Sequence, residues 1–203
     1  MKILVTGFDP FGGAKVNASL EALRRLPARI GALEIATVEL PTSYRRSLPA
    51  LEAAIARTKP QIVLCVGQAG DRSALCVERV AVNIQDASSP DNDGAQPVDA
   101  PVVAGGPAAY LATLPVRAAV AALRAEELPA ELSTSAGTFV CNHVFYGLMH
   151  VAATRRHPFR AGFLHVPALP QQAKAGAPSM PAESIARGIA VVLEVCAAAV
   201  MAD

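Results

Sequence analysis

Three residue types that work together in nucleophilic catalysis occur at Cys141, His165 and Glu78. A cysteine thiolate attacks a carbonyl carbon, an imidazole holds and returns the proton, and a carboxylate orients the imidazole. Cys141 lies where a strand pattern over 132–140 gives way to a helix pattern over 142–155. Helix N-termini favour anions, so this position suits a thiolate. The three residues predict acyl-transfer chemistry if the fold brings them together.

The position of Cys141 also suits a core cysteine or a metal ligand. The chain has four cysteines and no C-x-x-C pair, and Cys141 and His143 form only a C-x-H, whose side chains point to different sides of a helix. We therefore expect no metal site and, without an export signal, no disulfide framework. Cys65 and Cys196 lie in apolar patterns and are predicted core residues, while Cys76 is ambiguous.

His165 and Glu78 have structural alternatives as well. A lone histidine in a strand is more often structural than catalytic, so His165 gains weight from its pairing with the cysteine. Glu78 precedes Arg79 and could form a surface ion pair, and Asp71 and Asp86 are rival carboxylates. The choice depends on where the strands place these side chains.

The elements that must position these residues alternate between strands and helices. Strand patterns cover 2–6, 34–39, 61–66, 79–84, 132–140 and 160–166. Helix patterns cover 17–26, 48–57, 115–126, 142–155 and 182–199. Apolar strands interleaved with helices predict one α/β domain over 1–203, with an open sheet covered on both faces.

The last two strands predict how Cys141 and His165 meet. Strand 132–140, helix 142–155 and strand 160–166 form a βαβ unit, so we expect the two strands to run parallel. Cys141 then follows the carboxyl end of the first strand, and His165 ends the second. Both would lie at the edge where open α/β sheets bind ligands.

Two further segments should reach the same edge. Strand 79–84 follows strand 61–66 too closely for a helical crossover, so we expect it to return antiparallel, with Glu78 at its start. The loop "TGFDPFGG" leaves the first strand there and carries Phe8 and Phe11. Its glycine spacing resembles a phosphate loop, but the required Lys-Ser/Thr is missing. The two phenylalanines favour an apolar pocket instead.

One segment, 86–114, lacks a clear period and is rich in Pro, Gly, Asp and Ala. A loop this long within a domain is usually functional or an interaction arm. A plain surface excursion is the alternative.

The composition excludes several classes of protein. Of the 203 residues 52% are hydrophobic and 17% charged, the net charge is +1, and aromatic residues make up only 4%, without tryptophan, so we expect no nucleic-acid partner. The first residues are too short an apolar run for a signal peptide. The late run "IAVVLEVCAAAV" is 12 residues long and contains Glu194, too short to span a bilayer. These features predict a soluble cytoplasmic protein with no membrane partner.

Four motifs in order, "TGFDPFGG", "GQAG" with "ERVAVN", "AGTFVCNHVFYGLMH" and "GFLHVPALP", resemble the bacterial pyroglutamyl peptidase I (pyrrolidone-carboxylate peptidase) family. The resemblance extends from Lys2 to the last helix. It implies a thiol-dependent exopeptidase that removes N-terminal 5-oxoproline from peptides. It also implies a single α/β/α sandwich with a twisted, mixed, mostly parallel open sheet, a homotetramer, and no cofactor.

The resemblance assigns roles to named residues. It implies that Cys141 is the nucleophile, His165 the general base and acid, and Glu78 the orienting carboxylate. The residues that match the family's pyroglutamyl pocket and its polar lining are Phe8, Phe11, Asn17, Thr42, Gln68, Phe139 and Val140.

This chain departs from the family at "DASSPDN", where bacterial relatives usually have "DARIPDN", so Ser88 and Ser89 replace an Arg and an Ile that border the site. We expect the two serines to alter the local pocket wall and the catalytic efficiency, but not the catalytic triad.

Two other function classes fit a similar sheet, because a fold does not determine a function. A phosphorylase-type enzyme would need a phosphate-binding Arg or glycine loop and would depend on phosphate. A silent binding or scaffold protein would keep the pocket and tolerate loss of Cys141. Thiol alkylation distinguishes them, since only the peptidase is expected to lose all activity when one site is modified.

Overall fold

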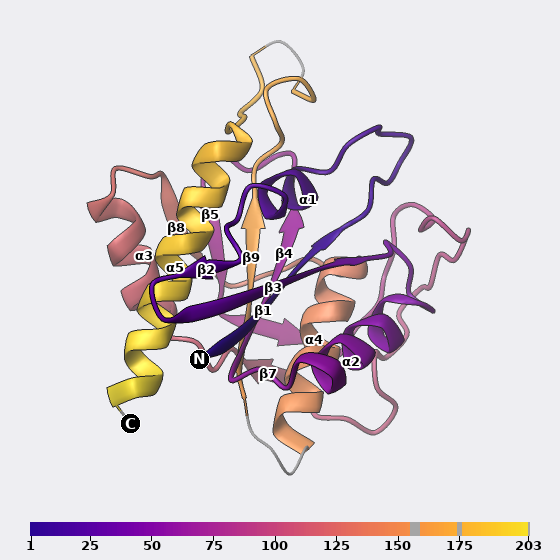
Figure 1. Ribbon diagram of the computed structural model, residues 1–203. Coiled ribbons are helices and arrows are strands. Elements are labelled where there is room, and N and C mark those ends of the chain that lie inside the picture. Colours follow the sequence, from indigo (N-terminus) through magenta and orange to yellow (C-terminus); the bar gives the residue numbers. More distant parts are fainter. Residues whose placement is uncertain (155–158, 174–175, 203) are drawn as a thin grey trace.

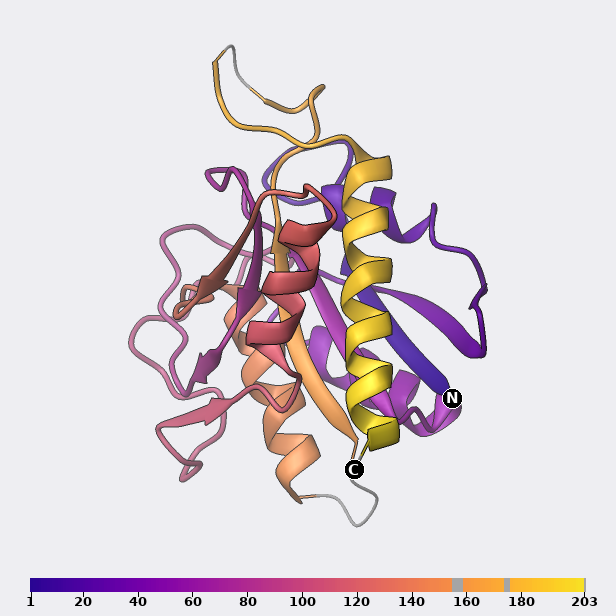
Figure 2. The same ribbon diagram turned by 90° about the vertical axis from the view of Figure 1, so that its left-hand side faces the viewer.

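A seven-stranded sheet forms the middle layer of the molecule, with helices on both faces (Figures 1 and 2). The structure, a computed structural model, describes residues 1–154, 159–173 and 176–202. The strand order is β2-β3-β1-β4-β9-β5-β8. These strands are β1 (Lys2–Phe8), β2 (Arg29–Ile30), β3 (Leu33–Leu40), β4 (Ile62–Gln68), β5 (Leu75–Glu78), β8 (Ala130–Ser133) and β9 (Arg160–Val166).

The helices divide between the two faces of the sheet. They are α1 (Ala18–Leu23), α2 (Ser47–Thr58), α3 (Val116–Ala125), α4 (Val140–Thr154) and α5 (Ala182–Ala202). Helices α1, α3 and α5 pack over one face and α2 and α4 over the other, and each face has its own apolar core. Central strands are apolar along their whole length because both of their faces are covered. The end of the predicted helix 142–155, Arg155, lies outside the described residues.

The predicted mixed, mostly parallel α/β sheet is confirmed. β1 runs parallel to β3 and β4, and β4 runs parallel to β9. β5 runs antiparallel to β9. On the side of the sheet that α4 covers, Cys65 in β4 and Phe163 in β9 belong to one core. Side chains two residues apart in a strand share a face, so Gly67 and His165 also face α4.

The predicted parallel βαβ unit is wrong. β8 ends at Ser133 and runs parallel to β5, which is antiparallel to β9, so β8 and β9 run in opposite directions. The strand pattern stops early because Ser133 and Ser135 bond to nearby backbone groups and Gly137 has a positive φ of 73°. Residues 134–139 instead form a connection that leads to α4.

Only part of the predicted strand 79–84 is a strand, Val80–Val82, and its predicted antiparallel place in the main sheet is wrong. The strand that returns antiparallel is β5. Glu78 is the last residue of β5, whereas the prediction placed Glu78 at the start of a strand. β6 (Val80–Val82) leaves the main sheet and pairs with β7 (Ala109–Leu111) in a separate two-stranded sheet. The run "LCVERVAV" is nearly continuous in its apolar pattern, so periodicity gives no sign of the break at Arg79.

Helix α5 is longer than the 12-residue apolar run that is visible in the sequence, so the expectation that this segment is too short to span a bilayer is wrong. It has 21 residues and, by length and composition only, is able to cross a membrane. In this structure α5 lies against the sheet with α1 and α3, and Ile185, Ile189 and Leu193 are completely buried. The core helix of a globular protein meets the same criterion.

The segment 86–114 is folded back onto the domain. The Asp91 carboxylate accepts hydrogen bonds from the backbone N–H groups of Tyr44, Asp93 and Ala95. Asp93 forms a bidentate ion pair with Arg46 at the start of α2, and both N–O distances are 2.7 Å. This anchoring lays the segment beside the carboxyl end of β3.

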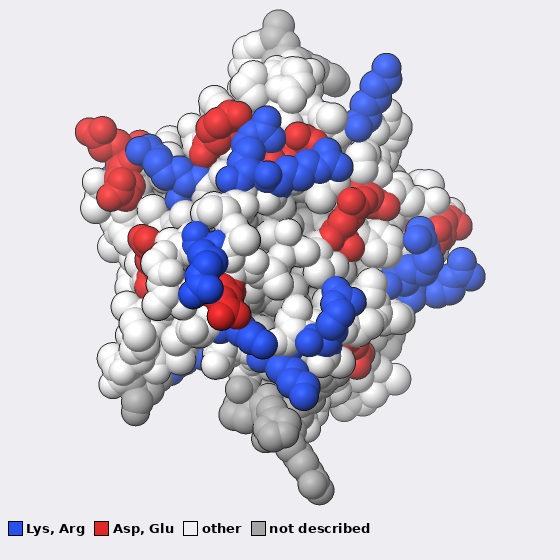
Figure 3. Space-filling model, in the orientation of Figure 1, with Lys and Arg blue, Asp and Glu red and all other residues white. Residues whose placement is uncertain are grey.

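On the face of the molecule in Figure 3, basic and acidic side chains are interspersed.

Candidate active site

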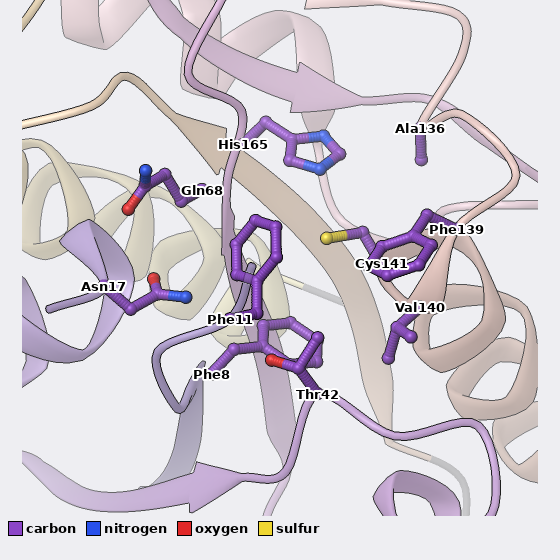
Figure 4. Close-up of a pocket in the computed structure, with 10 residues that line it drawn as sticks. All are labelled: Phe8, Phe11, Asn17, Thr42, Gln68, Ala136, Phe139, Val140, Cys141 and His165. Carbon is purple, nitrogen blue, oxygen red and sulfur yellow. The ribbon is translucent and has the colours of Figure 1, made fainter. Parts of the chain in front are cut away.

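Cys141 is the second residue of α4, and its sulfur points toward the His165 ring (Figure 4). Asn142, the next residue, is completely buried and ties this first turn to the chain around β6. Its side-chain oxygen accepts from the Val82 N–H at 3.0 Å, and its nitrogen donates to the carbonyls of Val82 and Ile84. These three bonds hold the helix start, and with it the thiol, in place over β9. No pattern in the sequence singles out Asn142.

Glu78 and His165 meet across the antiparallel pair of β5 and β9. Glu78 lies opposite Phe163, and Cys76 lies opposite His165, so Glu78 and His165 are diagonal neighbours on one face. Nδ1 of His165 is 2.8 Å from Oε1 of Glu78. Glu78 is completely buried, and its other oxygen, Oε2, has no hydrogen-bond partner within the described chain. The structure thus brings the three predicted residues together, although by a different strand arrangement.

The surroundings of His165 favour its charged form. Burial alone would lower the pKa of His165, but hydrogen bonds with Cys141 and Glu78, together with their charges, raise this pKa to about 9. The Glu78 bond also fixes the ring so that Nε2 is left for the thiol side. The imidazolium is therefore the expected form at neutral pH.

A cavity of about 150 Å³ adjoins the thiol. It is lined by Phe8, Phe11, Asn17, Thr42, Gln68, Ala136, Phe139, Val140, Cys141 and His165 (Figure 4). All seven predicted pocket residues therefore lie around it, and Ala136 is an addition that the sequence did not indicate. Neither Arg nor Lys is among the described residues that line it, although a phosphate-binding site would need one. Ser88 and Ser89 are exposed and do not line it.

Asp9 holds the polar side of this cavity together. Its carboxylate accepts from the Thr42 N–H at 2.6 Å and from the side-chain amide of Asn92 at 3.2 Å. Its backbone carbonyl accepts from Asn17 Nδ2 and from the Thr42 hydroxyl. Asp9 thereby joins the loop after β1, which carries Phe11, to the end of β3. No sequence pattern marks this role, because Asp9 looks like any loop aspartate.

Comparisons with known proteins place this geometry in a family. A model of the pyroglutamyl peptidase family matches residues 1–199. A pyrrolidone-carboxylate peptidase from Treponema denticola is 48% identical over 96% of this chain and 92% of its own length. One from Gloeobacter violaceus is 52% identical over 96% of each. The chain belongs to the pyroglutamyl peptidase family.

Solved structures show the family's fold as well. The crystal structure of pyroglutamyl peptidase I from Bacillus amyloliquefaciens has a TM-score of 0.93 at 44% identity and covers 97% of both chains. A mutant pyrrolidone carboxyl peptidase from Pyrococcus furiosus has a TM-score of 0.94 at 38% identity over 98% of this chain and 99% of its own. The resemblance to this cysteine peptidase family is thus confirmed.

The other cysteines of this family member are poor nucleophiles. Cys65 and Cys196 are completely buried, which confirms them as core residues, and burial raises the pKa of each to about 12. Burial also raises the pKa of Cys76, which lies next to Arg72. Cys141 is the one cysteine that is partly exposed. Within the described residues, no group of three or more His, Cys, Asp or Glu could hold a metal ion.

Gly67 is a further site residue that the sequence analysis did not single out. It faces α4, and a Cβ atom there would lie 2.9 Å from the Cys141 sulfur and 2.8 Å from the Phe163 ring. Gly67→Ala is therefore expected to displace the thiol and lower kcat/KM by about 10²-fold, as small misplacements of a reacting group do. Steady-state kinetics on a pyroglutamyl substrate measure this effect. Gly70→Ala, whose Cβ would meet only Ala168 at 3.9 Å, is the matched control for thermal stability. Unchanged kinetics in Gly67→Ala would contradict the close approach.

His143 should make the fold sensitive to acid. It is 5% exposed and packs edge-on against Tyr44, and within the described chain neither ring nitrogen makes a hydrogen bond of ordinary geometry. Burial lowers the pKa of His143 from 6.5 to about 4, and the Tyr44 backbone and the Asp91 charge oppose this only in part. The unfolded chain takes up the proton first, so the stability associated with neutral His143 is complete above pH 6.5 and is lost as the pH falls toward 4.

We expect His143 to account for about 2 kcal/mol of the stability lost between pH 7 and pH 4.5. Urea unfolding gives the free energy of unfolding of the wild type and of His143→Phe at both pH values. The drop between pH 7 and pH 4.5 in the wild type, minus the drop in His143→Phe, measures this loss. His150→Gln, on the same helix, is the control. An equal loss in the wild type and His143→Phe would show that His143 already carries its proton in the folded state.

Proposed function

We propose that this chain hydrolyses the bond after an N-terminal pyroglutamyl residue through a thioester on Cys141. The observation that carries the proposal is the meeting of a thiol, an imidazole and a buried carboxylate beside an apolar cavity. Membership of the pyroglutamyl peptidase family supports the substrate class.

In the first half of the reaction, the Cys141 thiolate attacks the carbonyl carbon that joins 5-oxoproline to the next residue. The C–N bond then breaks, and His165 gives its proton from Nε2 to the leaving amine, while the thioester forms. In the second half, His165 takes a proton from water, which attacks the thioester and releases 5-oxoproline and the thiolate. Glu78 accepts the Nδ1 hydrogen bond throughout and stabilises the positive ring.

The start of α4 supplies donors for the oxyanion. The first N–H groups of a helix have no partner within it, and those of the turn that contains Cys141 lie beside the reacting carbon. The loop that follows Gln68, the last residue of β4, lies at the same edge and could add a backbone amide. One such donor is typically worth about 3–4 kcal/mol in the transition state.

The apolar wall explains why a lactam is selected. Phe8, Phe11 and Phe139 surround the cavity and could enclose the flat, uncharged 5-oxoproline ring. An ordinary N-terminal amine is charged and would lose its hydration there without a partner, which costs several kcal/mol. Kinetics on matched fluorogenic pyroglutamyl, prolyl and glutamyl amides test this. We expect the last two to be cleaved at least about 10³-fold more slowly. Equal cleavage of all three would refute the proposal.

The expected homotetramer and cytoplasmic location belong to the same proposal; the tetramer rests on the resemblance to the family, and the location rests on the sequence features described above. Light scattering coupled to size-exclusion chromatography measures the assembly, and a monomer at micromolar concentration would contradict it.

A further inference from the structure

A second hollow, of about 720 Å³, adjoins the catalytic cavity and shares Phe11 and Gln68 with it. Its other walls come from the loop between β1 and α1 and from the chain that follows β9, including Val16, Ala168 and Gln172. We call this hollow the outer groove. It is several times larger than the 150 Å³ cavity, so it could hold more than a single ring.

The outer groove starts beside the ends of β4 and β9, next to His165. His165 lies opposite Gly67 in the β4–β9 pair, and Gln68 lies opposite Val166. The two chains stay together past the sheet edge, because the Ala69 N–H donates to the Val166 carbonyl at 2.9 Å. The groove therefore begins one residue beyond the imidazole that, in the proposed function, protonates the leaving amine.

Two glutamines define the junction between the cavity and the outer groove. Oε1 of Gln68 accepts from the Ala18 N–H at 2.7 Å and from Nε2 of Gln172 at 3.2 Å. Gln172 is itself held at both ends, since its Nε2 also donates to the Val16 carbonyl and its Oε1 accepts from the Leu169 N–H. The Gln68 oxygen is thus turned toward the protein. Its Nε2 has no protein partner in the described chain and remains as a donor at the junction.

Among the described residues, the lining of the outer groove carries positive charge only. Lys15 is exposed and is its only charged lining residue among those described, and none of these is acidic. No ion pair of Lys15 occurs within the described chain. A bound peptide with negative charge would therefore meet an unpaired cation there.

We propose that the outer groove binds the part of the substrate that follows the scissile bond, and that it favours acidic peptides. This inference rests on the proposed function and extends it. Nε2 of Gln68 donates to a backbone carbonyl of the leaving peptide, and Lys15 attracts a carboxylate farther along. Gln172 is a positioning residue, because its amide bonds to Gln68, Val16 and Leu169 and acts on the peptide through the orientation of Gln68.

The test uses three peptides and the intact enzyme. They are pyroglutamyl-alanine amide, its extension by two alanines, and the same extension ending in glutamate. We expect kcat/KM to rise about tenfold from the short to the extended neutral peptide, mainly through KM, as one added hydrogen bond with apolar contact allows. At low salt, kcat/KM for the acidic peptide should be about threefold higher than for the extended neutral peptide. This difference should disappear at high salt.

Two variants separate the parts of the proposal. In Gln172→Ala, kcat/KM for the extended peptide should exceed that for the short peptide by no more than about twofold, since one hydrogen bond to Gln68 is lost. Lys15→Glu should reverse the order of the acidic and neutral extended peptides. Arg117→Glu, the same charge reversal on the exposed side of α3, should keep the wild-type order.

The outcomes distinguish this inference from the proposed function. Equal kcat/KM for the short and extended peptides in the wild type would overturn the outer groove and leave the peptidase intact. A length preference that survives Gln172→Ala unchanged would overturn the role of Gln172. If none of the three peptides is cleaved, the proposed function itself fails.

Discussion

Replacing Cys141 by alanine should abolish release of a fluorogenic amine from its pyroglutamyl derivative, with a loss in kcat of at least about 10⁴-fold. No other thiol can take over, because Cys65, Cys76 and Cys196 are at most 1% exposed. The fold should survive, since the side chain is partly exposed and α4 is held by Asn142. Circular dichroism and thermal unfolding check that point.

Alkylation gives an independent measurement of the same thiol. Iodoacetamide should modify Cys141 alone in the folded enzyme and remove all activity, with mass spectrometry locating the label. Cys196→Ala is the matched control and should retain both activity and its inactivation by iodoacetamide. Turnover that persists in Cys141→Ala would refute the mechanism. If iodoacetamide then removed that remaining activity, a second reactive thiol would be responsible.

Glu78→Gln should lower kcat by about 10³- to 10⁴-fold, the size of effect seen when an orienting carboxylate becomes an amide. The amide keeps the shape of the side chain but removes the charge that lies 2.8 Å from Nδ1 of His165. It can also turn its NH₂ group toward the ring and favour the wrong tautomer. Glu131→Gln, an exposed glutamate on the neighbouring strand β8, is the control and should behave like the wild type.

The pH profile separates this role from a merely structural one. Because the pKa of His165 is raised to about 9, the wild type should lose activity as the pH rises through 9 and the imidazolium loses its proton. Without the Glu78 charge the same limb should move to lower pH. The stability linked to charged His165 has the same sign, since it is complete below pH 6.5 and is lost as the pH rises through about 9. An alkaline limb that stays in place in Glu78→Gln would mean that Glu78 does not act on His165.

The chemistry of the site could be predicted from the sequence because it depends on residue types next to local patterns. A cysteine at the start of a helix, a histidine at the end of a strand and an apolar loop after the first strand are visible within a few residues each. The alternation of strands and helices likewise predicts the α/β class. Motif similarity then supplied the pocket residues, which do line one cavity.

The direction and pairing of the strands could not be predicted in the same way. The sequence predicted that Cys141 and His165 meet through a parallel βαβ unit, yet β8 runs opposite to β9, with β5 between them. Hydrophobic periodicity records which face of a strand is buried but not which strand lies beside it. The two residues still meet, because residues 134–139 bring α4 over β9 on the face that His165 shares with Phe163.

By itself, then, the sequence determined the fold class, the catalytic candidates and the apolar character of the pocket, since each depends on local side-chain chemistry. The family resemblance implied Glu78 as the orienting carboxylate. The tertiary structure decided that Glu78 reaches the histidine, rather than Asp71 or Asp86, because this follows from a diagonal contact between β5 and β9. It also decided that Gly67 must lack a side chain and that Asp9 and Gln172 orient pocket residues. Such roles come from contacts between segments that are distant in sequence, and no local pattern contains them.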